Sequence, residues 1–162
     1  MLHKLSKYND DGFTIIEVMI VLAIAGLIML IVFLAVPALQ RNAHNTSIKN
    51  DVAGLLGSMN EYTNNNGGTV PANQATVITG TTATIGTGCS TAGANCATTR
   101  VGYLTSASIV SAIPASAPAV GSVALITDAT CNGNTPTTTG ATARNYVAFF
   151  QLEGGAVQCS AS

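Results

Sequence analysis

One apolar segment constrains the fold of this chain more than any other feature. Residues 13–39 read FTIIEVMIVLAIAGLIMLIVFLAVPAL, and Glu17 is their only ionisable residue. A helix of roughly 20 apolar residues spans the hydrocarbon core of a bilayer. Lys4 and Lys7 precede the segment, so the positive-inside rule places the N-terminus in the cytoplasm and the remaining chain outside. We therefore expect residues 13–38 to form a single membrane-spanning helix.

The rest of the chain has a different composition. Only 8% of the 162 residues are charged, and the last hundred residues are rich in Thr, Ala, Gly, Ser and Asn. The formal net charge of −1 gives no basic footprint for nucleic acid, so no nucleic-acid partner is predicted. The sequence also lacks a Ser/His/Asp set, a phosphate-binding loop and metal-ligand spacing. We expect neither catalytic residues, nor a metal site, nor a cofactor, and the chain is not predicted to be an enzyme.

The start of the apolar segment separates three interpretations. A plain signal anchor explains the apolarity but not the carboxylate of Glu17. A signal peptide cleaved at Val36-Pro37-Ala38 would have an apolar core longer than the usual 7–15 residues. The third interpretation comes from Gly12-Phe13-Thr14-Ile15-Ile16-Glu17 and the residues up to Ile24, which resemble the processing site of type IV prepilins. Two features depart from that family. Acidic residues precede the glycine where relatives usually have basic ones, and Pro37 falls about one turn late.

This resemblance implies a processing step and a set of partners. A prepilin peptidase would cut after Gly12, remove residues 1–12 as a leader peptide, and methylate the new N-terminus at Phe13. The retained helix would then assemble copies of the chain, with the help of the pilus machinery at the inner membrane. The implied product is an extracellular type IV pilus filament. A pseudopilin of a secretion or competence system and a membrane-anchored adhesin that does not polymerise remain the alternatives.

Glu17 has a physical rationale of its own. A carboxylate at the centre of a membrane helix costs about 2.5–3.5 kcal/mol, so it needs a function or a partner. After cleavage Glu17 would lie near the N-terminus of the helix, where the helix dipole favours an anion. We expect it to pair with the Phe13 amine of a neighbouring subunit. Gly26 and Pro37 are predicted to give the helix flexibility, because proline removes a backbone hydrogen bond, and the resemblance implies that residues 26–37 lose helicity in a filament.

The helical pattern continues beyond the apolar segment. Apolar residues recur at steps of three and four and predict an amphipathic continuation over residues 39–66, which ends at Asn64-Asn65-Asn66-Gly67-Gly68. The members of this stripe are Ile48, Val52, Leu55, Leu56, Met59 and Tyr62. The charged residues Arg41, Lys49, Asp51 and Glu61 are expected on the exposed face of the helix. His44 is predicted to be a solvated helix residue, because no metal-ligating group lies near it in sequence.

Residues 67–162 are predicted to form a globular head with a small antiparallel sheet. A short strand is expected near Thr76–Ile78 and a helical turn near Ser106–Ile113. Alternating patterns predict further strands at Ser122–Thr127, Asn145–Leu152 and Ala156–Cys159, with a hairpin at Glu153-Gly154-Gly155. The fold class is therefore α+β, with a long N-terminal helix packed on a small sheet.

All four cysteines lie in the predicted head. An even number in a small polar domain favours disulfides and an oxidising compartment. Cys89 and Cys96 are spaced to close a small loop, and Cys131 and Cys159 would tie an irregular segment to the last strand. A C-terminal loop bounded by a disulfide is also common in the pilin family, which this chain resembles.

Overall fold

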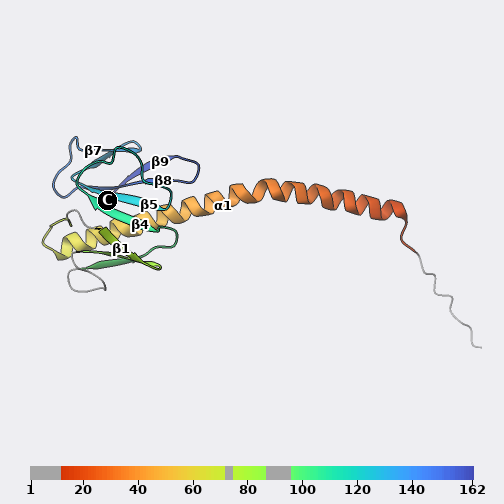
Figure 1. Cartoon of the computed structure of the whole chain (residues 1–162), viewed down its shortest axis with the longest axis horizontal. Helices are drawn as coiled ribbons and strands as arrows, with labels where there is room; N and C mark the ends of the chain where they lie inside the picture. Colours follow the sequence, from red (N-terminus) through yellow and green to blue (C-terminus); the bar gives the residue numbers. More distant parts are fainter. Residues whose placement is uncertain (1–11, 72–74, 87–95) are drawn as a thin grey trace, which may run out of the picture. The chain divides into compact units, whose positions relative to one another are not determined.

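The computed structural model of the chain describes residues 12–71, 75–86 and 96–162. Of the predicted leader, residues 1–12, only Gly12 falls within these ranges. The chain divides into two compact units, Met1–Gln40 and Arg41–Ser162, and each is considered by itself. The helix α1 (Ile15–Asn65) contributes residues to both units (Figure 1). The α+β fold with a long N-terminal helix is confirmed.

In the first unit α1 consists almost entirely of apolar residues. It stays helical through Gly26 and Pro37, so the proline does not interrupt it. The large apolar side chains from Phe13 to Leu39 are between 40% and 86% exposed. These side chains therefore have no core of their own, and the unwinding of residues 26–37 in a filament stays a prediction.

The second unit combines residues 41–65 of α1 with a seven-stranded sheet of order β3-β2-β1-β4-β5-β8-β9. Two further strands, β6 and β7, form a separate two-stranded sheet. The strands are β1 (Ala75–Thr79), β2 (Thr82–Ile85), β3 (Ala97–Arg100), β4 (Ser106–Val110), β5 (Ser122–Thr127), β6 (Thr130–Asn132), β7 (Thr135–Thr137), β8 (Tyr146–Gln151) and β9 (Val157–Ala161).

The seven-stranded sheet is mixed. β5, β8 and β9 pair antiparallel, as predicted, with Val123 opposite Phe150 and Phe149 opposite Cys159. β4 pairs in parallel with β5, and residues 111–121 make the crossover that a parallel pair requires. The expected helical turn at 106–113 is wrong. Ala107 and Ile109 are buried while Ser106 and Ser108 are exposed, which is the alternation of a half-buried strand.

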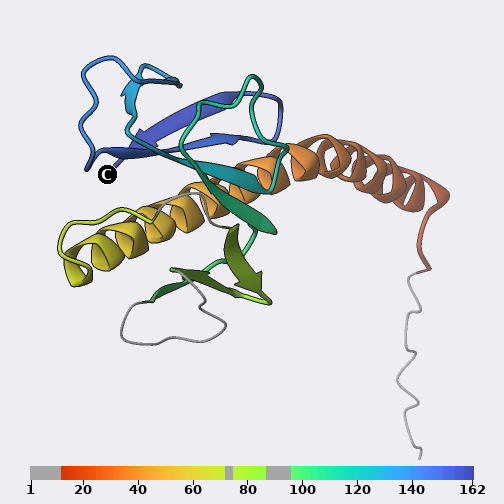
Figure 2. The same ribbon diagram turned by 60° about the vertical axis from the view of Figure 1, so that its left-hand side comes forward.

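The predicted apolar stripe of α1 forms the centre of the head. Ile48, Leu55 and Met59 are fully buried, in one cluster with residues of the sheet such as Leu125 and Phe150. Figure 2 shows the reason: the twisted sheet curves around this part of the helix, with β8 and β9 on one side and β1 on the other. The apolar stripe of α1 is therefore the surface against which the sheet packs.

The C-terminus of α1 ends as the glycine pair predicts. Gly67 and Gly68 both have positive φ, 65° and 85°, and the Gly68 N–H donates to the Thr63 carbonyl at 2.8 Å. This is the pattern of a Schellman motif. The last turn of α1 has no basic residue, but the guanidinium of Arg144 lies against Gly68. Arg144 therefore brings a positive charge to the negative end of the helix dipole.

At Gly54 the helix α1 lies close against the sheet. A Cβ atom at this position would lie 2.7 Å from the Thr99 hydroxyl oxygen on β3. Gly57 lies one turn later on the exposed side, where an added Cβ meets nothing within 4 Å. The two glycines thus share a helix but differ in what a side chain would contact.

We predict that Gly54→Ala destabilises the head although alanine is the better helix former. The overlap with Thr99 should cost about 1–3 kcal/mol. Gly57→Ala is the matched control and should stabilise by about 0.5–1 kcal/mol. Because Thr99→Ala removes the obstructing atoms, the double variant Gly54→Ala/Thr99→Ala should recover most of the loss. Thermal unfolding of the full chain in detergent measures all four variants, and strictly additive effects would contradict the close contact.

Candidate functional site

The predicted processing residues, Gly12 and Phe13, lie in an exposed segment before the first helix. Gly12, Phe13 and Thr14 precede α1, which begins at Ile15. Gly12 and Phe13 are exposed, and an added Cβ at Gly12 would meet nothing within 4 Å. The peptide bond between Gly12 and Phe13 therefore precedes the helix and joins two exposed residues.

Thr14 and Glu17 form a reciprocal cap at the start of α1. The Glu17 carboxylate accepts hydrogen bonds from the Thr14 backbone N–H at 3.3 Å and from its hydroxyl at 3.2 Å. The Thr14 hydroxyl in turn accepts from the Glu17 N–H at 3.4 Å. This is a capping box, and the spacing Thr-x-x-Glu was present in the sequence as its signal. Glu17 is thereby held at the positive end of the helix dipole by Thr14, the residue that follows Phe13.

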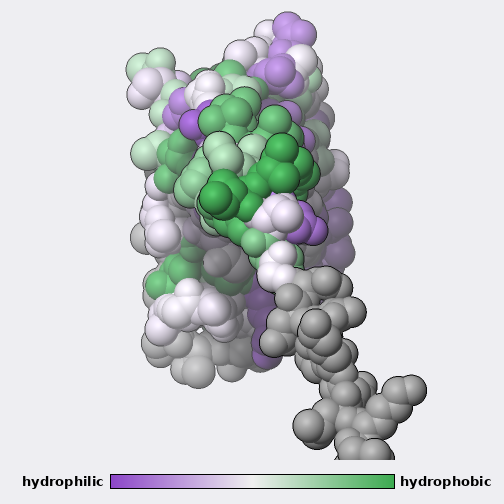
Figure 3. Space-filling view, turned by 90° about the vertical axis from the view of Figure 1, so that its right-hand side faces the viewer, coloured by the Kyte–Doolittle hydropathy of each residue, from purple (hydrophilic) through white to green (hydrophobic). Residues whose placement is uncertain are grey.

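The apolar surface that follows is continuous. Figure 3 shows hydrophobic residues gathered on the face turned to the viewer. Within the described residues α1 is the helix long and apolar enough to cross a membrane, with a mean hydropathy of 3.2 over its most apolar window. A continuous apolar surface of this extent must be covered by lipid or by protein.

A second polar site lies where the β8–β9 hairpin meets α1. The Glu153 carboxylate accepts a hydrogen bond from the Tyr103 hydroxyl at 2.6 Å and lies 2.8 Å from His44 Nδ1. The rings of His44 and Tyr103 are also in contact, with centroids 4.9 Å apart. The backbone N–H of Glu153 donates to the Asn45 side-chain oxygen at 2.8 Å. We call Glu153, His44, Tyr103 and Asn45 the Glu153 clamp.

The clamp corrects the prediction that His44 is merely a solvated residue. Its side chain is about half exposed, but its ring nitrogen contacts a carboxylate 109 residues away in the sequence. The hydrogen bond from Tyr103, followed by the contact with His44, lowers the pKa of Glu153, and the more distant positive charge of Arg41 adds to this. The same hydrogen bond to Glu153 raises the pKa of Tyr103. These contacts tie the β8–β9 hairpin and the loop containing Tyr103 to the helix.

Asp51 is the second correction, because it does not lie on the exposed face of the helix. Its side chain is only 7% exposed, whereas Lys49 and Glu61 are exposed as predicted. The carboxylate accepts hydrogen bonds from the backbone N–H groups of residues 102, 103 and 104 at 2.7–3.0 Å. Asp51 therefore organises the loop between β3 and β4. Its position beside Val52 in a mixed helical pattern gave no signal for this role.

One predicted disulfide is confirmed. Cys131 on β6 and Cys159 on β9 are bonded, with Cα atoms 5.7 Å apart, so the small β6–β7 sheet is fastened to the edge of the large one. Cys96 is disulfide-bonded as well. Cys89 lies outside the described residues, so the Cys89–Cys96 pair stays a prediction.

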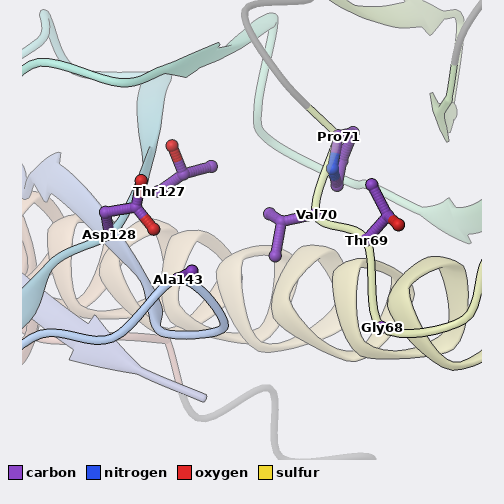
Figure 4. A pocket seen from close by; sticks show the side chains of 7 residues that line it. All are labelled: Gly68, Thr69, Val70, Pro71, Thr127, Asp128 and Ala143. Carbon is purple, nitrogen blue, oxygen red and sulfur yellow. The ribbon is translucent and has the colours of Figure 1, made fainter.

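A cavity of about 310 Å³ lies beside the C-terminus of α1. Figure 4 shows Thr127 and Asp128 on one side and Val70 and Pro71 on the other. Asp128 has a positive φ of 56°, and its backbone N–H donates to the Asn145 carbonyl at 2.8 Å. Among the described residues that line the cavity, Asp128 is the one ionisable group, so they offer no acid–base pair. Within the described ranges, no three His, Cys, Asp or Glu residues are grouped so as to hold a metal ion.

We predict that Asp51→Ala destabilises the head by about 3 kcal/mol, because three backbone donors lose a charged acceptor. Asp51→Asn retains an acceptor oxygen and should lose less. Glu61→Ala, an exposed acidic position on the same helix, should change stability by no more than about 0.5 kcal/mol. Chemical denaturation of the full chain in detergent distinguishes these outcomes. Equal effects of Asp51→Ala and Glu61→Ala would show that the loop does not depend on Asp51.

We also predict that the Glu153 clamp weakens in acid. A carboxylate with a lowered folded-state pKa contributes stability above its unfolded pKa of about 4.3, and this contribution is lost as the pH falls through the lower folded value. Glu153→Gln should therefore lower the Tm at pH 7, and the difference from the unmodified chain should shrink by about pH 3. Glu61→Gln is the control and should show no such change. A Glu153→Gln deficit of equal size at both pH values would contradict the prediction.

Comparison with known protein families finds a match for one segment of the chain. A family model described as the prokaryotic N-terminal methylation motif matches residues 7–33. These residues include Gly12, Phe13, Thr14, Glu17 and Gly26. No curated protein and no solved structure matches the chain significantly.

Proposed function

We propose that this chain, whose residues 7–33 carry the type IV prepilin signature, is a pilin subunit that polymerises through its N-terminal helix into an extracellular filament. The observation that carries the proposal is the position of the motif. Its predicted cut site precedes the apolar helix, so the helix stays in the mature protein. A segment retained in this way serves assembly after it has served as an anchor.

Processing is the first step of the proposal. A prepilin peptidase cleaves after Gly12, and the Phe13 amine that results is methylated. The exposed, non-helical backbone at residues 12–14 supports this step, because a peptidase must bind its substrate in an extended form. Until assembly, the subunit is held in the cytoplasmic membrane by residues 13–38, with its head outside.

Assembly is the second step. In a membrane or a filament the charges of the Phe13 amine and the Glu17 carboxylate are costly to bury singly. Pairing Glu17 with the Phe13 amine of a neighbour neutralises both. The capping box supports this role, because Thr14 already holds the carboxylate at the helix N-terminus. Gly26 and Pro37 supply local flexibility while subunits pack.

The test is to separate the charge of Glu17 from its capping function. Glu17→Gln keeps a side chain suited to a capping box but removes the charge, Glu17→Leu removes both, and Thr14→Val removes only the hydroxyl of the cap. We expect both Glu17 variants to give few or no filaments, because an unpaired Phe13 amine costs about 3–5 kcal/mol per subunit. Thr14→Val should give filaments with a less stable helix start.

The measurement is filament yield after shearing, by electron microscopy, together with the mass of the mature N-terminus. Gly12→Arg serves as the processing control and should leave the leader uncut. A mature chain that begins at Phe13 but never forms surface filaments would favour the non-polymerising adhesin. Filaments confined to the periplasm would favour a pseudopilin. Unchanged filament yield from Glu17→Leu would refute the proposed pairing.

A further inference from the structure

Two Asn-Gly pairs occur in the chain, Asn66-Gly67 and Asn132-Gly133, and the structure holds them differently. An asparagine before glycine is prone to lose its side-chain amide, because glycine has no Cβ to hinder its own backbone nitrogen. That nitrogen attacks the side-chain carbonyl carbon of the asparagine. Whether it succeeds in a folded protein depends on how freely the asparagine side chain and the following peptide move.

Hydrogen bonds fix both the backbone and the side chain of Asn66. Its backbone N–H donates to the Tyr62 carbonyl at 3.0 Å, and its side-chain amide donates to the same carbonyl at 2.8 Å. Its own carbonyl accepts from the Thr69 N–H at 3.2 Å. Asn66 therefore directly follows α1, and hydrogen bonds at the helix end hold both its side-chain amide and its backbone.

Asn132 lies in the opposite setting. It ends β6 at the tip of the β6–β7 hairpin, where Asn132, Gly133, Asn134 and Thr135 are all exposed. Its carbonyl accepts from the Thr135 hydroxyl at 3.1 Å, but its side-chain amide makes no hydrogen bond with any residue that the structure describes. The leaving group is thus in solvent, where water is at hand for the later hydrolysis.

The hairpin itself is a weak element. β6 and β7 have three residues each, so the ladder between them is short. A two-stranded hairpin in water is marginally stable alone. The Cys131–Cys159 disulfide fastens it to β9 immediately before Asn132, so a local opening of the exposed tip does not require the head to unfold.

We propose that Asn132 is a site of spontaneous deamidation in the folded protein and that Asn66 is protected from it. The Gly133 backbone nitrogen loses its proton and forms a bond to the Asn132 side-chain carbon. The bond from that carbon to the amide nitrogen breaks, and ammonia leaves with the proton. Water then opens the cyclic imide, giving aspartate or isoaspartate.

The product adds one negative charge to a chain with a formal net charge of −1. This charge appears at an exposed tip, next to a disulfide rather than next to the helix that anchors the chain. The modification needs no enzyme and no cofactor. It accumulates with time and proceeds faster in mildly alkaline solution, because the attacking nitrogen must be deprotonated.

The experiment incubates the purified full-length chain in detergent at pH 8 and follows both sites by peptide mass spectrometry and isoaspartate detection. In the folded protein Asn132 should convert at least roughly tenfold faster than Asn66, since opening Asn66 requires breaking several hydrogen bonds. In denaturant the two rates should become similar. At pH 6 conversion of Asn132 should slow markedly.

Asn132→Gln is the matched variant, because glutamine keeps the amide but closes a larger ring less readily. It should abolish conversion at residue 132 and leave the rate at Asn66 unchanged. Equal rates at Asn132 and Asn66 in the folded chain would overturn the proposal. High rates at both sites in denaturant would show in that case that the fold protects Asn132 as well as Asn66.

Discussion

Helix α1 carries apolar side chains along most of its length, and the rest of the structure depends on what covers them. Between residues 41 and 65 the cover is the curved sheet, which buries Ile48, Leu55 and Met59 completely. Between residues 13 and 39 the large apolar side chains of the described chain are 40% to 86% exposed. One continuous helix thus serves two environments, and only one of them is made by the protein. The need for a cover of lipid or protein follows directly from this division.

The head is held to its helix by polar contacts as well as by the apolar core. Asp51 fixes the loop after β3, and the Glu153 clamp fixes the β8–β9 hairpin near the point where α1 enters the second unit. Both carboxylates bond to groups far away in sequence, so each fixes a segment that apolar packing alone would leave free to slide. Hydrophobic burial supplies most of the stability of such a domain, and bonds of this kind supply its geometry.

The sequence was informative where one signal dominated. Three signals predicted α1 to within a residue at its end: the apolar run, the apolar residues recurring at steps of three and four, and the glycine pair. Alternation of apolar and polar residues predicted β5, β8 and β9. The strands β2, β3, β4, β6 and β7 were missed because short segments of small and polar residues have little contrast between their two faces. β7 lies inside the segment that was predicted to be irregular. Asp51 and His44 were misread for another reason. A charged helix residue is solvated by default, and only the tertiary structure brings N–H groups or a carboxylate to it. The Thr-x-x-Glu spacing of the capping box is present in the sequence, but the apolar segment that contains it gives a stronger signal for a membrane helix.

The order of elements along the chain also governs when the head can be completed. The stripe on α1 finds its cover in residues of β5 and β8, and His44 bonds to a residue 109 positions later. Such long-range contacts close slowly, since a large loop must be ordered before they form. Because α1 precedes β8 and β9 in the sequence, it is synthesised first, and its apolar stripe stays exposed until these strands are available. A chain of this design is therefore most vulnerable to aggregation and proteolysis before the head is complete, and the closing of its last hairpin marks the end of that interval.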